Sequence, residues 1–345
     1  MSQPSSPRDP DSPVTPPSGR RWRRLLGWTI VVYTLVVLCL AAWMHARGDR
    51  AWLATIFLFG PRWFSAVPLL VLVPLAAIWH RRMLVLLAVA LVTVLFGVLG
   101  LEVHFSSADA PYRVRILTCN LNQMRFPLGE LNDLVATLNP DVVALQEVPY
   151  NPPPIDWPRG WHAVQFDKVI VASRHRVEPR EHVNRPLQPN KPLAVRFLVH
   201  LPSGQVQFFN LHLTTPREGL SAVIDRQRGL DFSGTGALEE SLLMRTAEAR
   251  LVRDWIEDFE GPKFVVGDFN TPADGAIYRD CWSDFLSAYS TAGFGFGYTK
   301  QTGRGLLRYG TRIDHILYTP PWRCVRAWVA ADIGSDHLPL VADFE

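Results

Sequence analysis

Hydrophobic residues follow two different patterns along this chain, and the change comes near residue 110. The first hundred residues contain long uncharged apolar runs, whereas from about Tyr112 onward short apolar stretches alternate with polar ones. Long apolar runs are typical of helices that cross a membrane, and short alternating ones of a globular domain. The sequence therefore predicts a membrane region over residues 20–105 and a separate domain over residues 106–345.

The apolar runs predict about three transmembrane helices, over residues 25–44, 63–79 and 83–101. The first run matches the length that crosses a hydrocarbon core of about 30 Å, and no small-residue cleavage site follows it, which argues against a signal peptide. One His and two Arg residues separate the last two runs, which predicts a tight helical hairpin. A shorter apolar piece at 51–60 leaves a fourth crossing or a re-entrant segment open. A buried helical bundle in a soluble protein is the remaining alternative.

Charges and prolines around these runs predict a tail and an orientation. Residues 1–19 contain six prolines among small polar residues, so we expect a disordered N-terminal tail. Five arginines precede the first run and two lie in the hairpin, against three in the 45–62 loop. Positive charge collects on the cytoplasmic side, so three crossings in an inner membrane would place residues 106–345 in the periplasm or outside the cell. A fourth crossing would reverse this orientation.

Net charge differs between the two parts of the chain. Residues 1–105 contain 10 Lys and Arg against 4 Asp and Glu, and residues 106–345 contain 25 against 28. The second part has no basic excess, which argues against avid, sequence-independent binding of duplex nucleic acid. None of the four cysteines forms a C-x-x-C pair, which argues against a zinc ribbon, whereas a Cys281–Cys324 disulfide is conceivable.

Short stretches rich in β-branched residues predict strands in the second part of the chain, and longer amphipathic stretches predict helices. The predicted helices cover residues 128–138 and 242–259. The predicted strands cover residues 114–117, 142–145, 169–172, 194–200, 206–213, 264–266, 313–318 and 325–329. Mixed strands with a few helices indicate an α/β domain.

Polar residues stand at the ends of most of these strands, where a rigid scaffold presents functional side chains. They are Asn120, Glu147, His212, Asp268 with Asn270, Asp314, and Asp336 with His337. Each alone is weak evidence, because an Asp-Phe-Asn is usually a turn and a lone His on an apolar strand is usually a core residue. Their order, each beside an apolar strand, is much more specific.

These stretches resemble the endonuclease/exonuclease/phosphatase superfamily of metal-dependent phosphoesterases. The matching residues are Thr118–Leu121, Leu145–Glu147, Asn210–Leu213, Gly267–Asn270, Arg312–Asp314 and Ser335–His337, with an Arg-led helix from Arg245. The resemblance covers about residues 112–345 and implies two packed mixed β-sheets flanked by helices, a four-layer sandwich. Cys119 departs from the family, which often has an aromatic residue at that position.

The resemblance also implies a metal site. Glu147 would be the main carboxylate ligand of Mg²⁺ or Mn²⁺, with Asn120 and Asp336 completing or supporting the metal shell. Such ions prefer oxygen ligands and retain several waters.

Catalytic and substrate-binding roles carry over in the same way. Asp268 would orient or deprotonate the attacking water, and His337 would donate to the phosphate with Asp314 fixing its tautomer. His212 would stabilise charge on the transition state or assist the leaving oxygen. The implied substrate-binding residues are Arg174, Arg245 and Asn270. The implied reaction is metal-assisted in-line hydrolysis.

Two long loops, over residues 214–240 and 290–309, are expected to shape the substrate site. The second contains glycines, aromatic residues and basic residues, a combination that can stack bases and hold phosphates but also occurs in flexible loops. Three functions remain open: a nuclease or general phosphodiesterase, a lipid phosphoesterase at the membrane surface, and a non-hydrolytic metal-binding membrane scaffold. The expected partners are the lipid bilayer and a phosphate-ester substrate, and no protein partner can be inferred.

Overall fold

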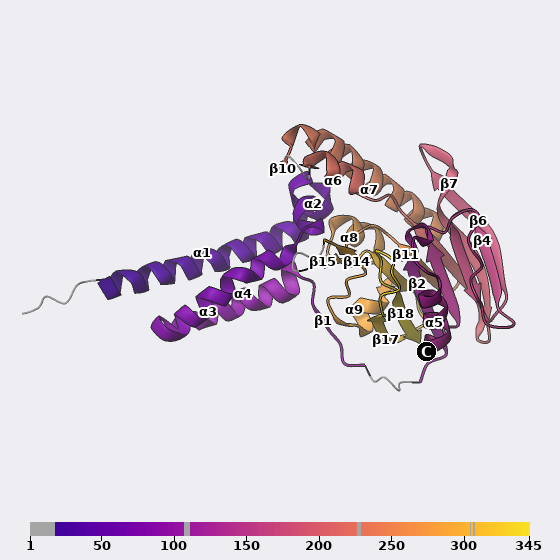
Figure 1. Cartoon of the computed structure of the whole chain (residues 1–345), viewed down its shortest axis with the longest axis horizontal. Helices are drawn as coiled ribbons and strands as arrows, with labels where there is room; N and C mark the ends of the chain where they lie inside the picture. The colour runs from indigo at the N-terminus through magenta and orange to yellow at the C-terminus, as the bar shows by residue number, and fades with distance from the viewer. Residues whose placement is uncertain (1–17, 107–110, 226–228, 304, 306–307) are drawn as a thin grey trace, which may run out of the picture.

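The computed structural model describes residues 18–106, 111–225, 229–303, 305 and 308–345. Helices near the N-terminus project from one side of a larger α/β domain (Figure 1). We call residues 18–105 the N-terminal helical region. The predicted disordered tail falls outside the described residues up to residue 17, and Ser18 already begins helix α1.

Each predicted transmembrane run forms a helical stretch. The first run lies within α1 (Ser18–Arg47), and the second comprises the turn η2 (Arg62–Ala66) and α3 (Val67–Trp79). The third comprises η3 (Arg81–Met83), α4 (Leu84–Val92) and the π-helical turn η4 (Thr93–Val98). Among the described residues, three stretches are long and apolar enough to cross a membrane, namely Arg21–Arg50, Arg62–Trp79 and Arg81–Val98.

The apolar piece at 51–60 forms a short helix instead of a fourth crossing. Turn η1 (Gly48–Arg50) ends α1, and α2 (Trp52–Phe59) follows it. Eight helical residues extend about 12 Å, well short of a hydrocarbon core of about 30 Å. Helix α2 packs against helix α7 (Thr235–Glu257) of the α/β domain, as Figure 1 shows above the end of α1.

The described part of the α/β domain contains two six-stranded mixed sheets. The first sheet has the strand order β17 (Cys324–Val329), β18 (Leu340–Phe344), β2 (Val114–Asn120), β3 (Val142–Gln146), β5 (Val169–Ser173) and β4 (His162–Phe166). The second has the order β12 (Leu286–Ser287), β16 (Asp314–Tyr318), β11 (Lys263–Asp268), β8 (Gly204–His212), β7 (Gln188–Leu201) and β6 (Val177–Arg185). Three short pairs complete the strands: β1 (Glu102–Val103) with β13 (Phe294–Gly295), β9 (Ile224–Asp225) with β10 (Gly229–Leu230), and β14 (Lys300–Thr302) with β15 (Tyr309–Thr311).

The two sheets pack face to face, with helices on their outer faces. Aromatic and β-branched side chains fill the space between the sheets, among them Phe197, Phe208, Phe264 and Phe344. Helix α5 (Gly129–Leu138) covers the first sheet, while α7 (Thr235–Glu257) and α8 (Ala276–Trp282) cover the second. The remaining helical pieces are η5 (Asn122–Met124), α6 (Arg217–Val223), η6 (Phe232–Gly234) and α9 (Ala288–Ala292). This arrangement is the four-layer sandwich that the sequence predicts.

Strand direction and register bring the functional positions to one edge. Strands β2 and β3 run parallel in one sheet, and β8 and β11 run parallel in the other. Parallel neighbours end at the same edge of a sheet. In the register Asn120 lies opposite Gln146, and Asp268 lies opposite both His212 and Asp314.

Four strands of the two six-stranded sheets are missing from the sequence-based prediction, as are the six short strands that pair outside these sheets. Strand β6 is a polar, largely exposed edge strand, whereas β4 is a short edge strand whose Val164 and Phe166 pack only partly buried against the core. Strands β12 and β18 also went unpredicted. The conceivable Cys281–Cys324 disulfide does not form, and both thiols are free. Cys281 packs between α8 and the second sheet, whereas Cys324 packs between the two sheets, so the two lie in different layers.

Both predicted substrate loops pack against the N-terminal helical region. In the first, Val223 and Leu238 form an apolar cluster with Trp52 and Ile56 of α2. In the second, Phe296 packs against the cluster around Leu99, at the end of the third apolar stretch. The α/β domain is therefore docked on these helices through its own loops.

Candidate active site

Two carboxylates accept hydrogen bonds from the same side-chain amide, that of Asn120, at the edge where the central strands end. The Asn120 side-chain nitrogen donates to Glu147 Oε1 at 3.0 Å and to Asp268 Oδ2 at 2.9 Å. Its Oδ1 accepts the backbone N–H of Asn122 at 2.9 Å. Asn120 therefore joins the two sheets and holds both carboxylates in place.

Glu147 follows β3 with a left-handed backbone, φ +51°. Non-glycine residues in this conformation are uncommon, and the strain often marks functional sites. The turn carries the side chain into the space between the sheets, where it is 28% exposed. Partial exposure leaves this carboxylate open to a cation and to water.

His212 ends β8 and faces the same pair of carboxylates. Its Nε2 lies 3.4 Å from Glu147 Oε1 and 3.8 Å from Asp268 Oδ2. Burial lowers the pKa of His212, although the two carboxylates oppose the shift. A neutral imidazole with a free nitrogen at this point can bind a cation or pass a proton.

His337 and Asp314 form a buried pair beside this cluster. His337 Nδ1 lies 2.8 Å from Asp314 Oδ2, so the N–H on Nδ1 donates to the carboxylate and Nε2 is turned toward Asp268 at 3.8 Å. Burial lowers the pKa of His337, but Asp314 and Asp268 together outweigh it, so the net shift is upward. The pair thus favours the protonated form of the imidazole next to Asp268.

Asp268 has the properties of a proton acceptor. It is 1% exposed, and burial together with the nearby Asp314 raises its pKa. A raised carboxylate pKa brings a base closer to the pH at which it works. The Asn270 N–H donates to Asp268 Oδ1 at 2.8 Å and fixes the carboxylate.

Two groups of side chains in the described part of the chain could hold a cation. They are Glu147, His212 and Asp268, and Asp268, Asp314 and His337, with ligand atoms within 4.8 Å of one another in each group. The first fits a divalent ion better, because it has an opening to water, whereas the second is fully buried and Asp314 Oδ2 is already bonded to His337 Nδ1. A divalent ion would also relieve the repulsion between the two carboxylates under Asn120.

Asp336 does not join either group. Its Oδ2 pairs with Lys300 Nζ of β14 and lies 3.8 Å from Arg217 Nη2 of α6. Asp336, predicted to be a metal ligand, thus faces the side-chain cations of Lys300 and Arg217 at the rim of the site. A substrate phosphate could replace the Asp336 carboxylate between them. Lys300 and Arg217 come from the two predicted substrate loops, which supports the expectation that these loops shape the site.

Asn270 and Arg245, both predicted to bind substrate, are buried, and their side chains already donate hydrogen bonds to backbone carbonyls. Asn270 has φ +50° and its side-chain nitrogen donates to the Leu213 carbonyl at 2.9 Å. Arg245, 3% exposed, donates to the carbonyls of Asn270 and Thr214 at 2.6 and 3.2 Å. Both residues shape the loops after β8 and β11, and Arg245 does not reach the site surface.

Arg174 lies at the wrong end of the sheet for its predicted role. It follows β5, whose last residue pairs with Val142 at the start of β3, whereas Glu147 lies beyond the other end of β3. Its guanidinium contacts Asp141 at 3.1 Å and Asn139 at 2.6 Å. Arg174 therefore stabilises the loop before β3 and lies away from the other predicted site residues.

A buried polar network beneath the site was missed from the sequence. Gln146 donates to Asn210 Oδ1 at 2.7 Å across the sheets, and the Asn210 nitrogen donates to the carbonyls of Leu145 and Ile170, each at 3.1 Å. Buried polar groups require partners, and here each partner belongs to the facing sheet. The sequence does contain a signal for this network, since the polar Asn210 interrupts the apolar strand Phe-Phe-Asn-Leu. It does not show which strand of the other sheet faces Asn210.

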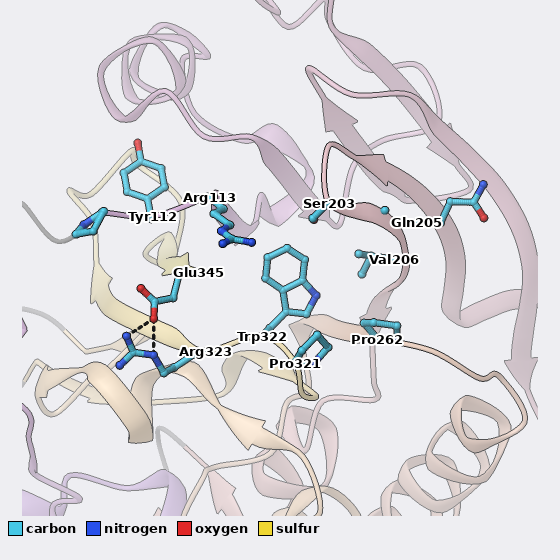
Figure 2. A pocket seen from close by; sticks show the side chains of 12 residues that line it. Tyr112, Arg113, Ser203, Gln205, Val206, Pro262, Pro321, Trp322, Arg323 and Glu345 are labelled. Atoms are coloured by element: carbon cyan, nitrogen blue, oxygen red, sulfur yellow. Dashed lines mark hydrogen bonds and ion pairs between the residues drawn. The ribbon is translucent and has the colours of Figure 1, made fainter.

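A hollow of about 660 Å³ lies at the opposite end of the sandwich (Figure 2). Trp322 stands at its centre, and the Arg323–Glu345 ion pair lies to one side. Val206 and Pro262, which line it, lie near the starts of β8 and β11, whereas His212 and Asp268 are at the ends of those strands. The hollow contains none of the predicted site residues.

Solved structures with a similar fold come from several organisms. An endonuclease/exonuclease/phosphatase family protein from Leptotrichia buccalis is 19% identical, covering 67% of this chain and 99% of its own, with a TM-score of 0.47. The corresponding values are 20%, 67%, 99% and 0.48 for the 3'-5' exonuclease NExo from Neisseria meningitidis. They are 18%, 67%, 99% and 0.46 for an AP endonuclease from Archaeoglobus fulgidus. No curated protein sequence matches this chain.

A family model matches a continuous stretch of the sequence. The matched stretch, residues 117–337, is described as the Endonuclease/Exonuclease/phosphatase family. It covers more than half of the chain and runs from β2 through every catalytic and metal-binding residue predicted from the sequence. This chain belongs to the endonuclease/exonuclease/phosphatase family.

Proposed function

We propose that this chain hydrolyses phosphate diesters with the help of a divalent cation, Mg²⁺ or Mn²⁺. One observation carries the proposal: Glu147, Asp268 and His337 are far apart in the sequence and converge at a single edge of the sandwich. Asn120 joins the two carboxylates, and His337 points at Asp268. A structural role alone would not require a base, an acid and an open carboxylate within one cluster.

The residues divide the chemistry between them. Glu147 with His212 and Asp268 would hold the cation, which supplies charge neutralisation for the phosphate oxygens. Asp268, with its raised pKa, accepts the proton of the attacking water. His337, kept protonated by Asp314, donates a hydrogen bond to a phosphate oxygen. Lys300 and Arg217 at the rim attract the anionic substrate.

The test uses the full chain in detergent, with Mg²⁺ or Mn²⁺ and a chromogenic phosphodiester. Glu147→Gln keeps the hydrogen bond from Asn120 but removes the charge, so kcat should fall about 10²-fold or more, and Mn²⁺ binding followed by electron paramagnetic resonance should weaken. The matched control is Glu260→Gln, an exposed carboxylate near the start of β11, which should keep both. A wild-type chain that binds Mn²⁺ but hydrolyses no phosphoester would favour the metal-binding scaffold instead.

A membrane lipid is the second candidate substrate, and one observation favours it. Arg217 and Lys300 belong to the two loops that dock on the N-terminal helical region, so the rim of the site is tied to helices long and apolar enough to cross a bilayer. Parallel assays with plasmid DNA and with phospholipid in mixed micelles separate the candidates. Release of a phosphorylated head group with intact DNA would select the lipid.

A further inference from the structure

The turn that ends α1 is fitted closely into the α/β domain. Gly48 has φ +41°, and a side-chain carbon at this position would meet the Ala276 backbone nitrogen at 2.6 Å. The next residue, Asp49, is fully buried although it carries a charge. A buried carboxylate requires hydrogen-bond or charged partners, so its contacts show what this turn does.

Asp49 has one partner on each side. Its Oδ1 accepts the Ile277 backbone N–H at 2.9 Å, in the first turn of α8. Its Oδ2 lies 3.9 Å from Arg245 Nη2 and accepts no hydrogen bond from the described residues. The side chains of Asp49 and Arg245 are 0% and 2% exposed, so the two charges face each other out of contact with water.

Arg245 connects this buried pair to the active site. Its Nη2 donates to the Asn270 carbonyl and its Nε to the Thr214 carbonyl. These carbonyls lie two residues after Asp268 and His212, in the loops that follow β11 and β8. One guanidinium therefore sets the spacing of two loops whose preceding residues face the cation site.

A charged guanidinium at this depth depends on its counter-ions. Burial lowers the pKa of Arg245, and Asp49 gives the largest opposing effect, ahead of Glu248 and Asp268. Within the described residues, no carboxylate other than Asp49 lies within 4.0 Å of Arg245. Removing one partner of a buried pair leaves the other charge uncompensated, which is strongly unfavourable.

We propose that Asp49 is a positioning residue for hydrolysis: the N-terminal helical region supplies the counter-ion that holds Arg245 across the loops bearing Asp268 and His212. Docking of these helices is then a condition of full activity, and the family-matched part of the chain is incomplete without them. The inference rests on the proposed phosphodiesterase function for its kinetic consequence. Its structural consequence, the order of the two loops, can be measured independently.

The experiment compares full-length variants in the same detergent or nanodisc. Asp49→Asn keeps an acceptor for the Ile277 N–H and removes only the charge that faces Arg245. We expect kcat to fall about tenfold or more, with KM within twofold of the wild type. Hydrogen–deuterium exchange should accelerate in peptides covering residues 213–216 and 268–272. Asp280→Asn, which removes the Arg50–Asp280 pair in the same interface, should change neither quantity.

A double-variant cycle separates positioning from general destabilisation. Arg245→Met should lower kcat as Asp49→Asn does, and the two changes together should cost little more than either alone. The double variant also has no unpaired buried charge at this point, so it can be assayed if Asp49→Asn proves too unstable. Wild-type kcat and wild-type exchange in Asp49→Asn, or additive losses in the pair, would overturn the inference. An inactive wild type would instead refute the proposed function, and the exchange comparison would still decide the role of Asp49.

Discussion

At the residue scale, the pairing of His337 with Asp314 sets the pH range of the proposed reaction. The carboxylates of Asp314 and Asp268 outweigh burial and raise the pKa of His337, which favours the charged imidazole. Asp314, whose own pKa is lowered chiefly by the opposing charge of His337 despite its burial, remains ionised and supplies part of that shift. Because activity needs the charged imidazole, it should fall as pH rises through the His337 pKa, whereas protonation of Asp268 should limit it at low pH.

Asp314→Asn should move this falling limb to lower pH. The amide keeps a hydrogen-bond acceptor but no charge, so the His337 pKa drops and kcat at pH 8 should decrease about 10²-fold. A pH–rate profile between pH 5.5 and 9 measures the shift. The control is Asp332→Asn, a half-exposed carboxylate that pairs with Arg308. An unchanged limb in Asp314→Asn would show that His337 is not the titrating group.

His315 predicts a pH dependence of stability. Burial lowers its pKa to about 4, and its Nε2 lies 2.9 Å from the Thr271 carbonyl. The unfolded chain takes up a proton below about pH 6.5, whereas the folded chain does so only near pH 4. Stability from this group is therefore complete above pH 6.5 and is lost as pH falls toward 4, by about 3 kcal/mol.

The variant His315→Gln should lack this pH-dependent contribution to the free energy of unfolding. Its free energy of unfolding should be lower than that of the wild type at pH 7, but should decline less between pH 6.5 and 4. Denaturant titrations at several pH values give the two slopes. Parallel curves for the two proteins would contradict the assignment of the buried neutral state to His315.

At the scale of elements, the connection between α1 and α2 is more constrained than the connection that leaves the helical region. Gly48 and Gly100 both have positive φ, +41° and +72°. A side-chain carbon at Gly48 would strike the backbone of α8, whereas at Gly100 it would meet nothing within 4 Å. The two glycines share the backbone cost and differ only in the steric contact.

Gly100→Ala should therefore cost about 1 kcal/mol, the usual cost of a left-handed alanine. Gly48→Ala should cost clearly more, because the backbone of α8 must move as well. Melting temperatures of the two variants in one detergent provide the comparison. Equal losses would indicate that the turn is not docked as tightly as its contacts require.

At the scale of the whole molecule, the α/β domain packs against the N-terminal helical region of the same chain. Besides the apolar clusters, the ion pairs Arg62–Asp274 and Arg312–Glu102 cross the junction. Figure 1 shows α1, α3 and α4 side by side, projecting away from the sheets. If these three stretches cross a membrane, the α/β domain lies on the side opposite the N-terminus.

A reporter enzyme that is active only outside the cytoplasm should be active when fused after Glu345 and inactive when fused after Arg82. The positive charges before the first helix and in the hairpin predict this result. The Arg82 fusion is the internal control, because it tests the hairpin end of the same helices. Activity from the Arg82 fusion alone would reverse the predicted orientation.

The sequence by itself determined the class of fold, the three apolar helices and the polar residues at the strand ends. These are local signals: apolar run length, strand periodicity and motifs such as Gly-Asp-Phe-Asn depend on neighbours along the chain. The residues that meet at this edge, from Asn120 to His337, were named from such motifs, and their roles came from the resemblance to the family.

Only the tertiary structure decided which charges meet. It placed Arg174 at the far end of its sheet, turned Asp336 toward Lys300, buried Arg245 and set Asp49 beside it. The free energy of a charge depends on burial and on partners that are distant in sequence, and no local pattern encodes either. That is why the residue types of the site followed from the sequence, whereas the link between the helical region and the site did not.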